Sequence, residues 1–194
     1  ARLRGAPCVW LQVREENLPA IRLYRDLGFI ENARRTSWIS RQEFATSWLS
    51  PGLKIMPRRY GDWAQHRTWL ERTYPKSLAW HLPIHHETFS PSPWGMFIAF
   101  VKGVQYRHWS AYRNDVLIGV LSYELSRPDE GLGWLAVDPR YEQEATAALL
   151  ISMRRQLSLS QRIVVDYPAH FAEEAFYRAG FSSSQTLIWM SIQF

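Results

Sequence analysis

The sequence predicts a mixed α/β (α+β) fold with a splayed, mainly antiparallel central sheet flanked by helices. The first reason is the order of elements over residues 53–194, which runs strand, helices, three-stranded meander, long helix, strand, helix, strand. The second is a strand–helix–strand pattern over residues 9–40 that recurs at the C-terminus. The composition allows such a core, because 46% of the 194 residues are hydrophobic and 21% are charged.

The N-terminal unit begins with a buried strand over residues 9–13 and continues into an amphipathic helix. Asn17 is a suitable N-cap, because its side-chain oxygen can accept a hydrogen bond from a free amide of the first turn. Apolar residues then recur at i, i+3, i+4 and i+7 in one stripe: Ala20, Leu23, Tyr24 and Leu27. Gly28 supplies a left-handed stop, and residues 34–40 alternate like a second strand.

The same unit is repeated near the C-terminus at an offset of 152 residues, the separation of Gly28 from Gly180. This register aligns similar residues: Leu11 with Ile163, Val13 with Val165, Ala20 with Ala172, Leu27 with Ala179 and Phe29 with Phe181. It also places Ala1 opposite Met153, inside a predicted helix. We interpret the pattern as an internal duplication in which the first copy is cut short.

The duplication defines the expected domains. Residues 1–45 form the C-terminal part of a first domain, residues 46–52 form a linker with a Ser-Pro-Gly breaker, and residues 53–194 form a complete second domain. The elements predicted within the second domain are a strand at 53–57, a helix around 62–74, an irregular segment with short helices at 75–103, a hairpin turned at 113–115, a strand at 131–139 and a helix at 142–157.

Charge, hydrophobicity and cysteine content indicate which classes of partner and which compartment to expect. The net charge of +5 comes almost wholly from scattered arginines, and no basic block forms, so we expect no nucleic-acid partner. No apolar run approaches the roughly 18 residues that can span a membrane, and no secretory leader opens the chain, so we expect no membrane partner. The single cysteine, Cys8, fits a reducing cytoplasm.

The stretch LQVREENLPAIRLYRDLGF carries the pattern N-x-x-A-x-x-L-Y-x-x-x-G-F. The residues at the pattern positions are Asn17, Ala20, Leu23, Tyr24, Gly28 and Phe29. In this motif and in the order of its elements, the chain resembles the GNAT superfamily of acyl-CoA-dependent N-acetyltransferases. The resemblance covers essentially the whole chain, as the last third of one domain and one complete domain. It implies a tandem-domain member with a truncated first domain and with acetyl-CoA as co-substrate.

The resemblance also implies a reaction, the direct attack of an amine on the acetyl-CoA thioester, and three site residues. Tyr24 matches the tyrosine that protonates the departing thiolate, and its alternative role is aromatic packing in the core. Asn17 is placed beside the pantetheine arm, with helix capping as an equal alternative. Val13, in the strand before the motif helix, is placed at the coenzyme together with Asn17.

The second domain departs from this pattern at its coenzyme loop. Glu142 falls near where the superfamily has arginine or glutamine, and alanines replace the loop glycines. Ala145 and Ala147 should therefore crowd a bound diphosphate, and Glu142, with Glu144, should repel it. Two polar motif residues are also replaced: Asn17 by Ala169 and Tyr24 by Phe176. We interpret the second domain as degenerate, although its intact strand at 132–139 should retain the cleft for pantetheine.

Residues 81–87, HLPIHHE, contain three histidines and a glutamate, a composition that would suit zinc. No cysteine or second ligand pair supports such a site, and Pro83 interrupts helical spacing, so we expect no metal and a polar loop near the substrate groove. The surrounding aromatic residues are Trp80, Phe89, Trp94, Phe97, Phe100, Tyr106, Trp109 and Tyr112. The resemblance implies that this region lines the groove for the acceptor amine, and core packing is the alternative.

Three functions stay open from the sequence. One is a tandem N-acetyltransferase that acetylates a small-molecule or peptide amine, with its truncated N-terminal half active. Another is an enzyme whose second domain is active despite its loop. The last is a non-catalytic GNAT-like module for ligand binding or dimerisation. A homodimer, the second domain, or the missing N-terminal part held separately could cover the apolar stripe of residues 9–40.

Overall fold

The computed structural model describes residues 7–41, 51–79, 81–82, 84–125, 130–157 and 161–194. The strands are β1 (Cys8–Arg14), β2 (Ile30–Ser40), β3 (Leu53–Pro57), β4 (Tyr106–Arg113), β5 (Val116–Leu125), β6 (Glu130–Val137), β7 (Arg162–Pro168) and β8 (Phe181–Gln193). The α-helices are α1 (Leu18–Asp26), α2 (Trp63–Thr73), α3 (Lys76–Ala79), α4 (Pro93–Val101), α5 (Glu142–Gln156) and α6 (Glu173–Arg178). Short 3₁₀ turns are η2 (Tyr60–Asp62), η3 (His86–Phe89) and η4 (Pro139–Tyr141). Residues 46–50 of the expected linker lie outside the described residues.

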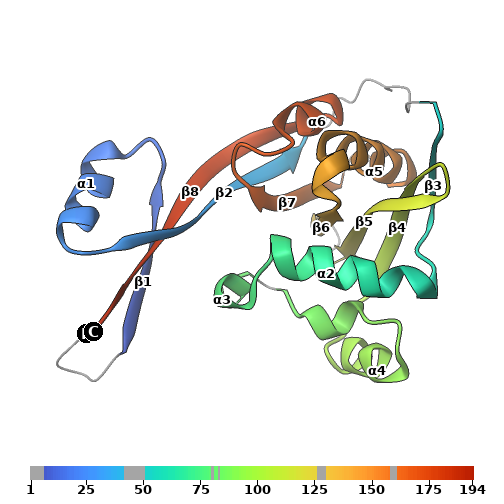
Figure 1. The fold of residues 1–194 in the computed structure, drawn as a ribbon, viewed down its shortest axis with the longest axis horizontal. Helices are drawn as coiled ribbons and strands as arrows, with labels where there is room; N and C mark the ends of the chain where they lie inside the picture. The colour runs from blue at the N-terminus through green and yellow to red at the C-terminus, as the bar shows by residue number, and fades with distance from the viewer. Residues whose placement is uncertain (1–6, 42–50, 80, 83, 126–129, 158–160) are drawn as a thin grey trace.

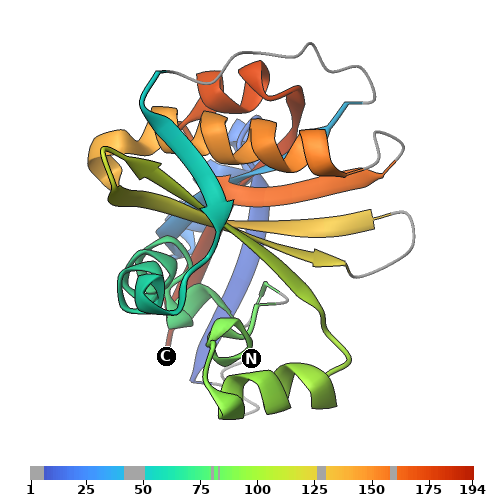
Figure 2. The same cartoon turned by 90° about the vertical axis from the view of Figure 1, so that its right-hand side faces the viewer.

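One sheet joins all eight of these strands, in the order β1-β8-β2-β7-β6-β5-β4-β3. Its neighbouring strands are antiparallel, apart from β6 and β7, which run parallel. Helices α5 and α6 lie on one face of the sheet, and α2, α3 and α4 lie on the other (Figures 1 and 2). The predicted mixed α/β class and the mainly antiparallel sheet flanked by helices are confirmed.

The two repeated units exchange strands. At the offset of 152 residues, β1, α1 and β2 correspond to β7, α6 and β8. The last strand of each unit pairs with the first strand of the other, since β2 pairs with β7 and β8 pairs with β1. In the central β2–β8 ladder, Arg35 pairs with Leu187, its own counterpart in the repeat. A pseudo-two-fold axis therefore passes between Arg35 and Leu187.

The predicted ends of the local elements are confirmed. The side chain of Asn17 caps α1 by accepting a hydrogen bond at 3.2 Å from the amide three residues on. Gly28 and Gly180 end the two repeated helices with φ of 88° and 76°, a conformation that favours glycine. The hairpin between β4 and β5 turns at Asn114 and Asp115, which both have positive φ, as a two-residue turn requires.

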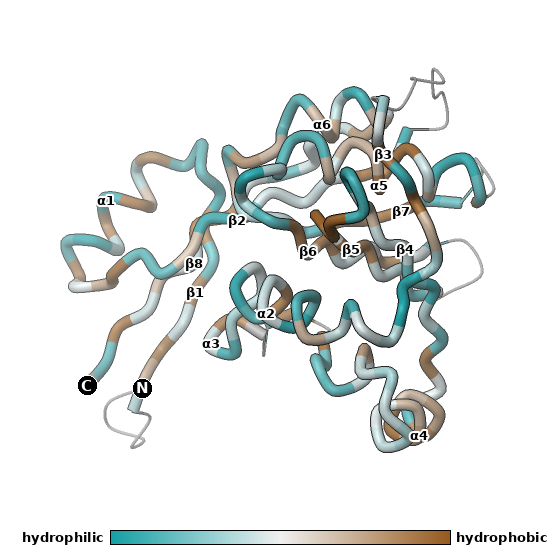
Figure 3. The backbone as a smooth tube through the Cα atoms, turned by 45° about the vertical axis from the view of Figure 1, so that its right-hand side comes forward, coloured by the Kyte–Doolittle hydropathy of each residue, from teal (hydrophilic) through white to brown (hydrophobic). Residues whose placement is uncertain are grey.

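The apolar stripe predicted for α1 is only partly right. Ile21 is the buried residue of this helix, and Tyr24 lies half-buried beside it against β1 and β8. Leu23 and Leu27 are 56% and 58% exposed. The spacing identified the apolar residues, but the helix packs through a face centred on Ile21. Figure 3 shows α1 at the end of long β-strands, apart from the other helices.

The main core lies between α5, α6 and the sheet. All residues of α5 from Ala145 to Arg154 are buried. A second cluster below the sheet joins α2 to β6 and includes Trp69, Tyr74 and Trp134. None of the described helices has the length and apolar character needed to cross a membrane.

Candidate functional site

The sheet opens between β7 and β6, the strand at which the superfamily resemblance places the pantetheine cleft. The parallel ladder runs from the pair Glu130–Arg162 to the pair Gly133–Val165 and then stops. Beyond this point the two strands separate, so the amide of Leu135 and the carbonyl of Asp166 are not paired with each other. The splayed geometry expected from the sequence is therefore present in the backbone.

The side chain of Tyr74 fills this cleft. Tyr74 follows the last residue of α2 and is fully buried. Its hydroxyl accepts a hydrogen bond from the Leu135 amide at 3.2 Å and donates one to the Asp166 carbonyl at 3.0 Å. Burial raises the pKa of Tyr74 far above its usual value, so the phenol stays a donor. The expectation that the fold retains this cleft is not met between Leu135 and Asp166, because the Tyr74 hydroxyl bonds to the backbone groups of both residues.

Arg35 holds this closure in place from β2. Its guanidinium is buried, pairs with the Asp166 carboxylate and donates through Nη1 to the carbonyl of Thr73 at 2.9 Å. The same group lies 4.9 Å from the centroid of the Tyr74 ring, a favourable cation–π distance. Arg35, on strand β2 of the first repeated unit, therefore helps to hold Tyr74 in the cleft between β6 and β7.

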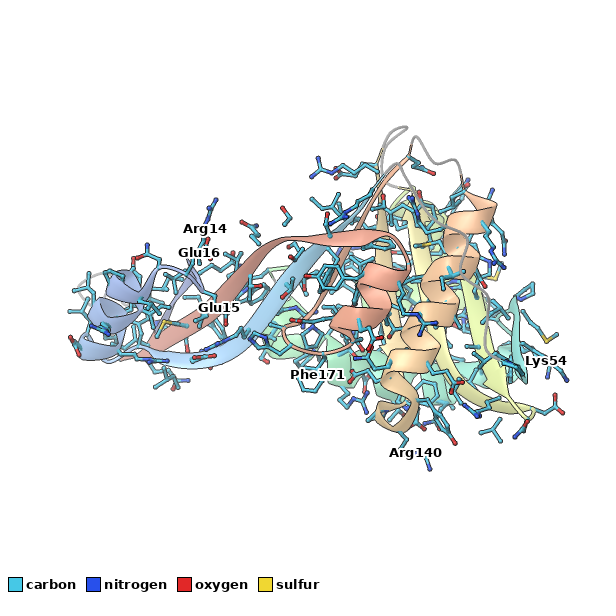
Figure 4. All side chains as sticks on the ribbon, turned by 90° about the horizontal axis from the view of Figure 1, so that it is seen from above. Arg14, Glu15, Glu16, Lys54, Arg140 and Phe171 are labelled. Atoms are coloured by element: carbon cyan, nitrogen blue, oxygen red, sulfur yellow. The ribbon has the colours of Figure 1, made fainter. Side chains whose placement is uncertain are left out.

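A hollow of about 630 Å³ remains outside the closed cleft, between the end of β7 and the first turn of α5. Glu142 lines it and accepts a hydrogen bond from the Tyr167 hydroxyl at 3.0 Å. Phe171 forms part of the rim, near the start of α6 (Figure 4). Glu142 thus lies at the start of α5, as expected, and its repulsion of a diphosphate at this helix N-terminus stays a prediction.

Two other features of the expected loop differ from the prediction. Ala145 and Ala147 do not project toward a ligand, because both side chains are buried in the main core. Glu144 is paired with Arg113 and is thereby partly neutralised. The charge expected to repel a diphosphate therefore belongs mainly to Glu142, and the side chain that closes the cleft between β6 and β7 is that of Tyr74.

The remaining motif counterparts of the second unit are core residues. Ala169 is buried, and its amide donates to the carbonyl of Arg34. Phe176 is fully buried and stacks on Trp38 with ring centroids 4.5 Å apart. Tyr177 is 52% exposed and meets Trp38 edge-on, so its hydroxyl does not replace that of Tyr24.

The residues assigned to the first unit lie together around α1. Tyr24 packs edge-on against Phe29, with ring centroids 5.7 Å apart. Asn17 caps the helix, which confirms the structural alternative for this residue and leaves a coenzyme contact as a prediction. The side chain of Val13 is 5% exposed and belongs to the same small core, so only its backbone could meet a ligand. The outer edge of β1 has no strand beside it among the described residues.

The histidine-rich segment is divided between the surface and the interior. His85 is exposed, His86 is buried, and His81 packs edge-on against Trp189. In the part of the chain that the structure describes, no group of three or more His, Cys, Asp or Glu side chains is arranged to hold a metal. The segment instead links η3 to the underside of the sheet.

The aromatic residues around this segment also separate into two classes. The buried members are Phe89, Trp109 and Tyr112, and the partly buried member is Tyr106. The exposed members lie on α4: Trp94, Phe97 and Phe100. Trp80 lies outside the described residues. Core packing thus accounts for the first class, while the aromatics of α4 face solvent.

Comparison with known proteins supports the fold. No family model and no curated protein sequence matches this chain. A GCN5-related N-acetyltransferase from Kribbella flavida superposes with a TM-score of 0.57 at 10% identity, covering 94% of this chain and 67% of that one. A GCN5-related N-acetyltransferase from Sphaerobacter thermophilus superposes with a TM-score of 0.57 at 15% identity, covering 99% of this chain and 63% of that one. A tandem GNAT protein from the clavulanic acid biosynthesis pathway superposes with a TM-score of 0.57 at 10% identity, covering 99% of this chain and 66% of that one.

At these identities the likeness shows that the chain has the GNAT fold. The chain spans 63% to 67% of the length of these three proteins. Activity, substrates and partners of a whole protein built on this fold are therefore proposals.

Proposed function

We propose that this chain is part of a tandem N-acetyltransferase of the GNAT superfamily, which transfers an acetyl group from acetyl-CoA to an amine. Transfer takes place in the half to which residues 7–40 belong, and the second half has no catalytic role. The observation that assigns transfer to this half, and not to the second, is the closed cleft between β6 and β7, where Tyr74 bridges Leu135 and Asp166. The residues of the second half do not suit acetyl-CoA, because the Tyr74 phenol lies between the strands and the Glu142 carboxylate lines the hollow outside them.

The repeat indicates where the active cleft would lie. β1 corresponds to β7, whose outer neighbour is β6, so a strand equivalent to β6 would lie beside the free edge of β1. Leu23 and Leu27 are exposed on α1, whereas their counterparts Ala175 and Ala179 are buried where α6 meets α5. A helix equivalent to α5 would cover the leucines. The coenzyme cleft of the first half would then lie beside Val13 and α1.

Within that half, Tyr24 is proposed to act as the acid. The amine nitrogen attacks the thioester carbon, the C–S bond breaks, and the departing thiolate takes a proton from the Tyr24 hydroxyl. The proton that the nitrogen loses passes to a base or to water, and the Tyr24 phenolate is reprotonated from solvent. A small-molecule or peptide amine as acceptor, and a cytoplasmic location, complete the proposal.

In the protein that contains both halves, Tyr24→Phe should lower turnover by more than about tenfold and leave acetyl-CoA affinity nearly unchanged. The hydroxyl acts only as the thiolate leaves, so its loss affects the transition state and not binding. Steady-state kinetics and calorimetry measure the two quantities. Tyr177→Phe, one position from the counterpart of Tyr24 in the repeat, is the matched control and should change neither.

An unchanged rate for Tyr24→Phe on a confirmed acceptor would return Tyr24 to a packing role. Absence of any transfer by the two-halved protein across amine acceptors would favour the second candidate, a non-catalytic GNAT-like module. The feature that favours this candidate is the closed cleft itself, since closure preserves the fold and removes the coenzyme site.

A further inference from the structure

Helix α4 turns its large apolar side chains toward solvent and its smaller ones toward the protein. The exposed residues are Pro93, Trp94, Met96, Phe97, Phe100 and Val101. At 100° per residue, these positions fall within one arc of about 160°. The residues on the opposite side of the helix are Gly95, Ile98 and Ala99. A surface helix normally packs its apolar face on the core, so the reversed orientation of α4 indicates a surface that another molecule covers.

This orientation is fixed by close packing at the first turn of the helix. Ser92 caps α4 by accepting a hydrogen bond from the Gly95 amide at 3.1 Å. A Cβ at Gly95 would lie 2.5 Å from the carbonyl oxygen of Ser90 and 2.8 Å from that of Glu87, so only glycine permits this approach of α4 to η3. The helix therefore cannot turn a larger residue toward the protein at this point, and the aromatic face stays outside.

The exposed face is large enough for a specific contact between two proteins. Trp94, Phe97 and Phe100 are 68%, 54% and 82% exposed. An aromatic side chain has about 150–250 Å² of surface, so these three with Met96 and Val101 offer roughly 600 Å². The largest apolar patches on monomeric proteins cover roughly 300–600 Å². Two such faces in contact would bury about 1,000 Å², which is near the lower limit for a specific interface.

The pattern of this face is the same when α4 is read from either end. Phe97 is the central residue of the nine in the helix. Exposed residues lie three and four positions from it on both sides: Trp94 and Pro93 before it, and Phe100 and Val101 after it. Two antiparallel helices that cross at Phe97 would therefore place Trp94 of each copy opposite Phe100 of the other. A two-fold interface requires this kind of self-complementary surface.

The charges at the two ends of α4 favour an antiparallel second copy. Residues 88–101 carry no charge, and the charged residues on either side of them are Glu87 and Lys102. Both are exposed. Glu87 lies beside the first turn of α4, where its carbonyl approaches Gly95, and Lys102 is the C-cap residue. An antiparallel second copy brings Lys102 of each copy to Glu87 of the other, whereas a parallel copy would bring like charges together.

Two other occupants fit this face less well. In the proposed arrangement, the missing part of the first half adjoins β1 and α1, and Figure 1 shows α1 and α4 at opposite ends of the molecule. An anionic lipid surface would attract Lys102 and repel Glu87, so the charges beside α4 give it no net attraction. A second copy of the chain satisfies both charges and covers the apolar face.

We propose that α4 is the interface of a homodimer, in which two copies of this chain pair their α4 helices antiparallel about a two-fold axis at Phe97. Phe97 meets its own counterpart on the axis, and Trp94 packs against Phe100 of the partner subunit. Lys102 forms an ion pair with Glu87 of the partner subunit. The proposal concerns association alone and does not depend on acetyl transfer.

Sedimentation velocity of this chain between about 1 and 300 µM tests the interface. The wild type should dimerise with a dissociation constant of about 1–100 µM, as expected for a small interface. Phe97→Glu should stay monomeric at every concentration, because two carboxylates would meet on the axis. Leu23→Glu is the matched control, since Leu23 is 56% exposed on α1, and this variant should dimerise like the wild type.

Charge reversal tests the antiparallel pairing. Lys102→Glu and Glu87→Lys should each raise the dissociation constant about fivefold or more, because like charges then face each other. The double variant should return to within about twofold of the wild type, because each ion pair is restored with its signs exchanged. Both residues are exposed, so the three variants are expected to fold.

A monomer over the whole concentration range would overturn the proposal. A dimer that survives Phe97→Glu, or that Leu23→Glu dissociates, would place the interface elsewhere and contradict it. A double charge variant that dimerises no better than the single variants would contradict the antiparallel pairing. Binding of a monomeric wild type to vesicles of phosphatidylserine and phosphatidylcholine, lost in Phe97→Glu, would assign α4 to a lipid surface instead.

Discussion

Replacing Arg35 with leucine, the residue at its counterpart position 187, should lower the free energy of unfolding by about 3–5 kcal/mol. Arg35 is 3% exposed and pairs with the carboxylate of Asp166, whose side chain is 20% exposed. Without the guanidinium, a largely buried carboxylate loses its partner, and the carbonyl of Thr73 loses a donor. Urea unfolding of the two proteins gives the difference directly.

A neighbouring arginine provides the control. Arg34→Ala removes ion pairs whose side chains are about one-third exposed, so it should cost about 1 kcal/mol or less. Combining Arg35→Leu with Asp166→Asn should recover part of the loss, because the unpaired charge is then absent. A loss below about 1 kcal/mol for Arg35→Leu would show that the exchanged strand is not held by this pair.

Acidification should destabilise the fold through two largely buried histidines, His66 and His108. The Nδ1 of His66 lies 3.1 Å from Nη1 of Arg58, which is a donor, so this nitrogen must be unprotonated. Burial and the Arg58 charge lower the pKa of His66, and the same two causes lower that of His108 to about 3. Protonating either ring in the fold is therefore unfavourable.

The direction of the pH effect follows from these lowered pKa values. Unfolded histidines take up a proton near pH 6.5 and the folded ones do not, so their contribution is complete above pH 6.5 and is lost as the pH falls toward 3. His108 should account for about 2 kcal/mol between pH 7 and pH 5, and His66 adds a loss in the same direction. Urea unfolding at these pH values should show a smaller loss for His108→Gln, whereas exposed His85→Gln should match the wild type. A flat profile over this range would contradict the neutral assignment.

Much of the fold was predictable because its signals are local. Asn17, Gly28 and Gly180 bound the two repeated helices through capping and left-handed backbone, which need only neighbouring residues. The exchange of β2 and β8 was not predictable in this way. It depends on pairing Arg35 with Leu187, residues far apart in the chain whose strand patterns do not specify a partner.

The site was less predictable than the fold, for a related reason. Glu142 was singled out because it falls near where the superfamily pattern has arginine or glutamine, and a carboxylate repels a diphosphate. Tyr74, which closes the cleft, is one aromatic residue at the end of a helix and belongs to no motif. Ala145 was expected beside a ligand because of its place in the superfamily loop pattern, whereas its side chain is buried in the main core.

The central claim is that the second half has the GNAT fold without its coenzyme cleft, and titration of acetyl-CoA into this chain tests it most directly. Isothermal calorimetry at low salt, where charge effects are least screened, is the measurement. We expect no binding up to about 1 mM coenzyme, because Tyr74 occupies the backbone groups of Leu135 and Asp166 and Glu142 opposes the diphosphate. A dissociation constant in the low micromolar range, with coenzyme density between β6 and β7, would contradict the account.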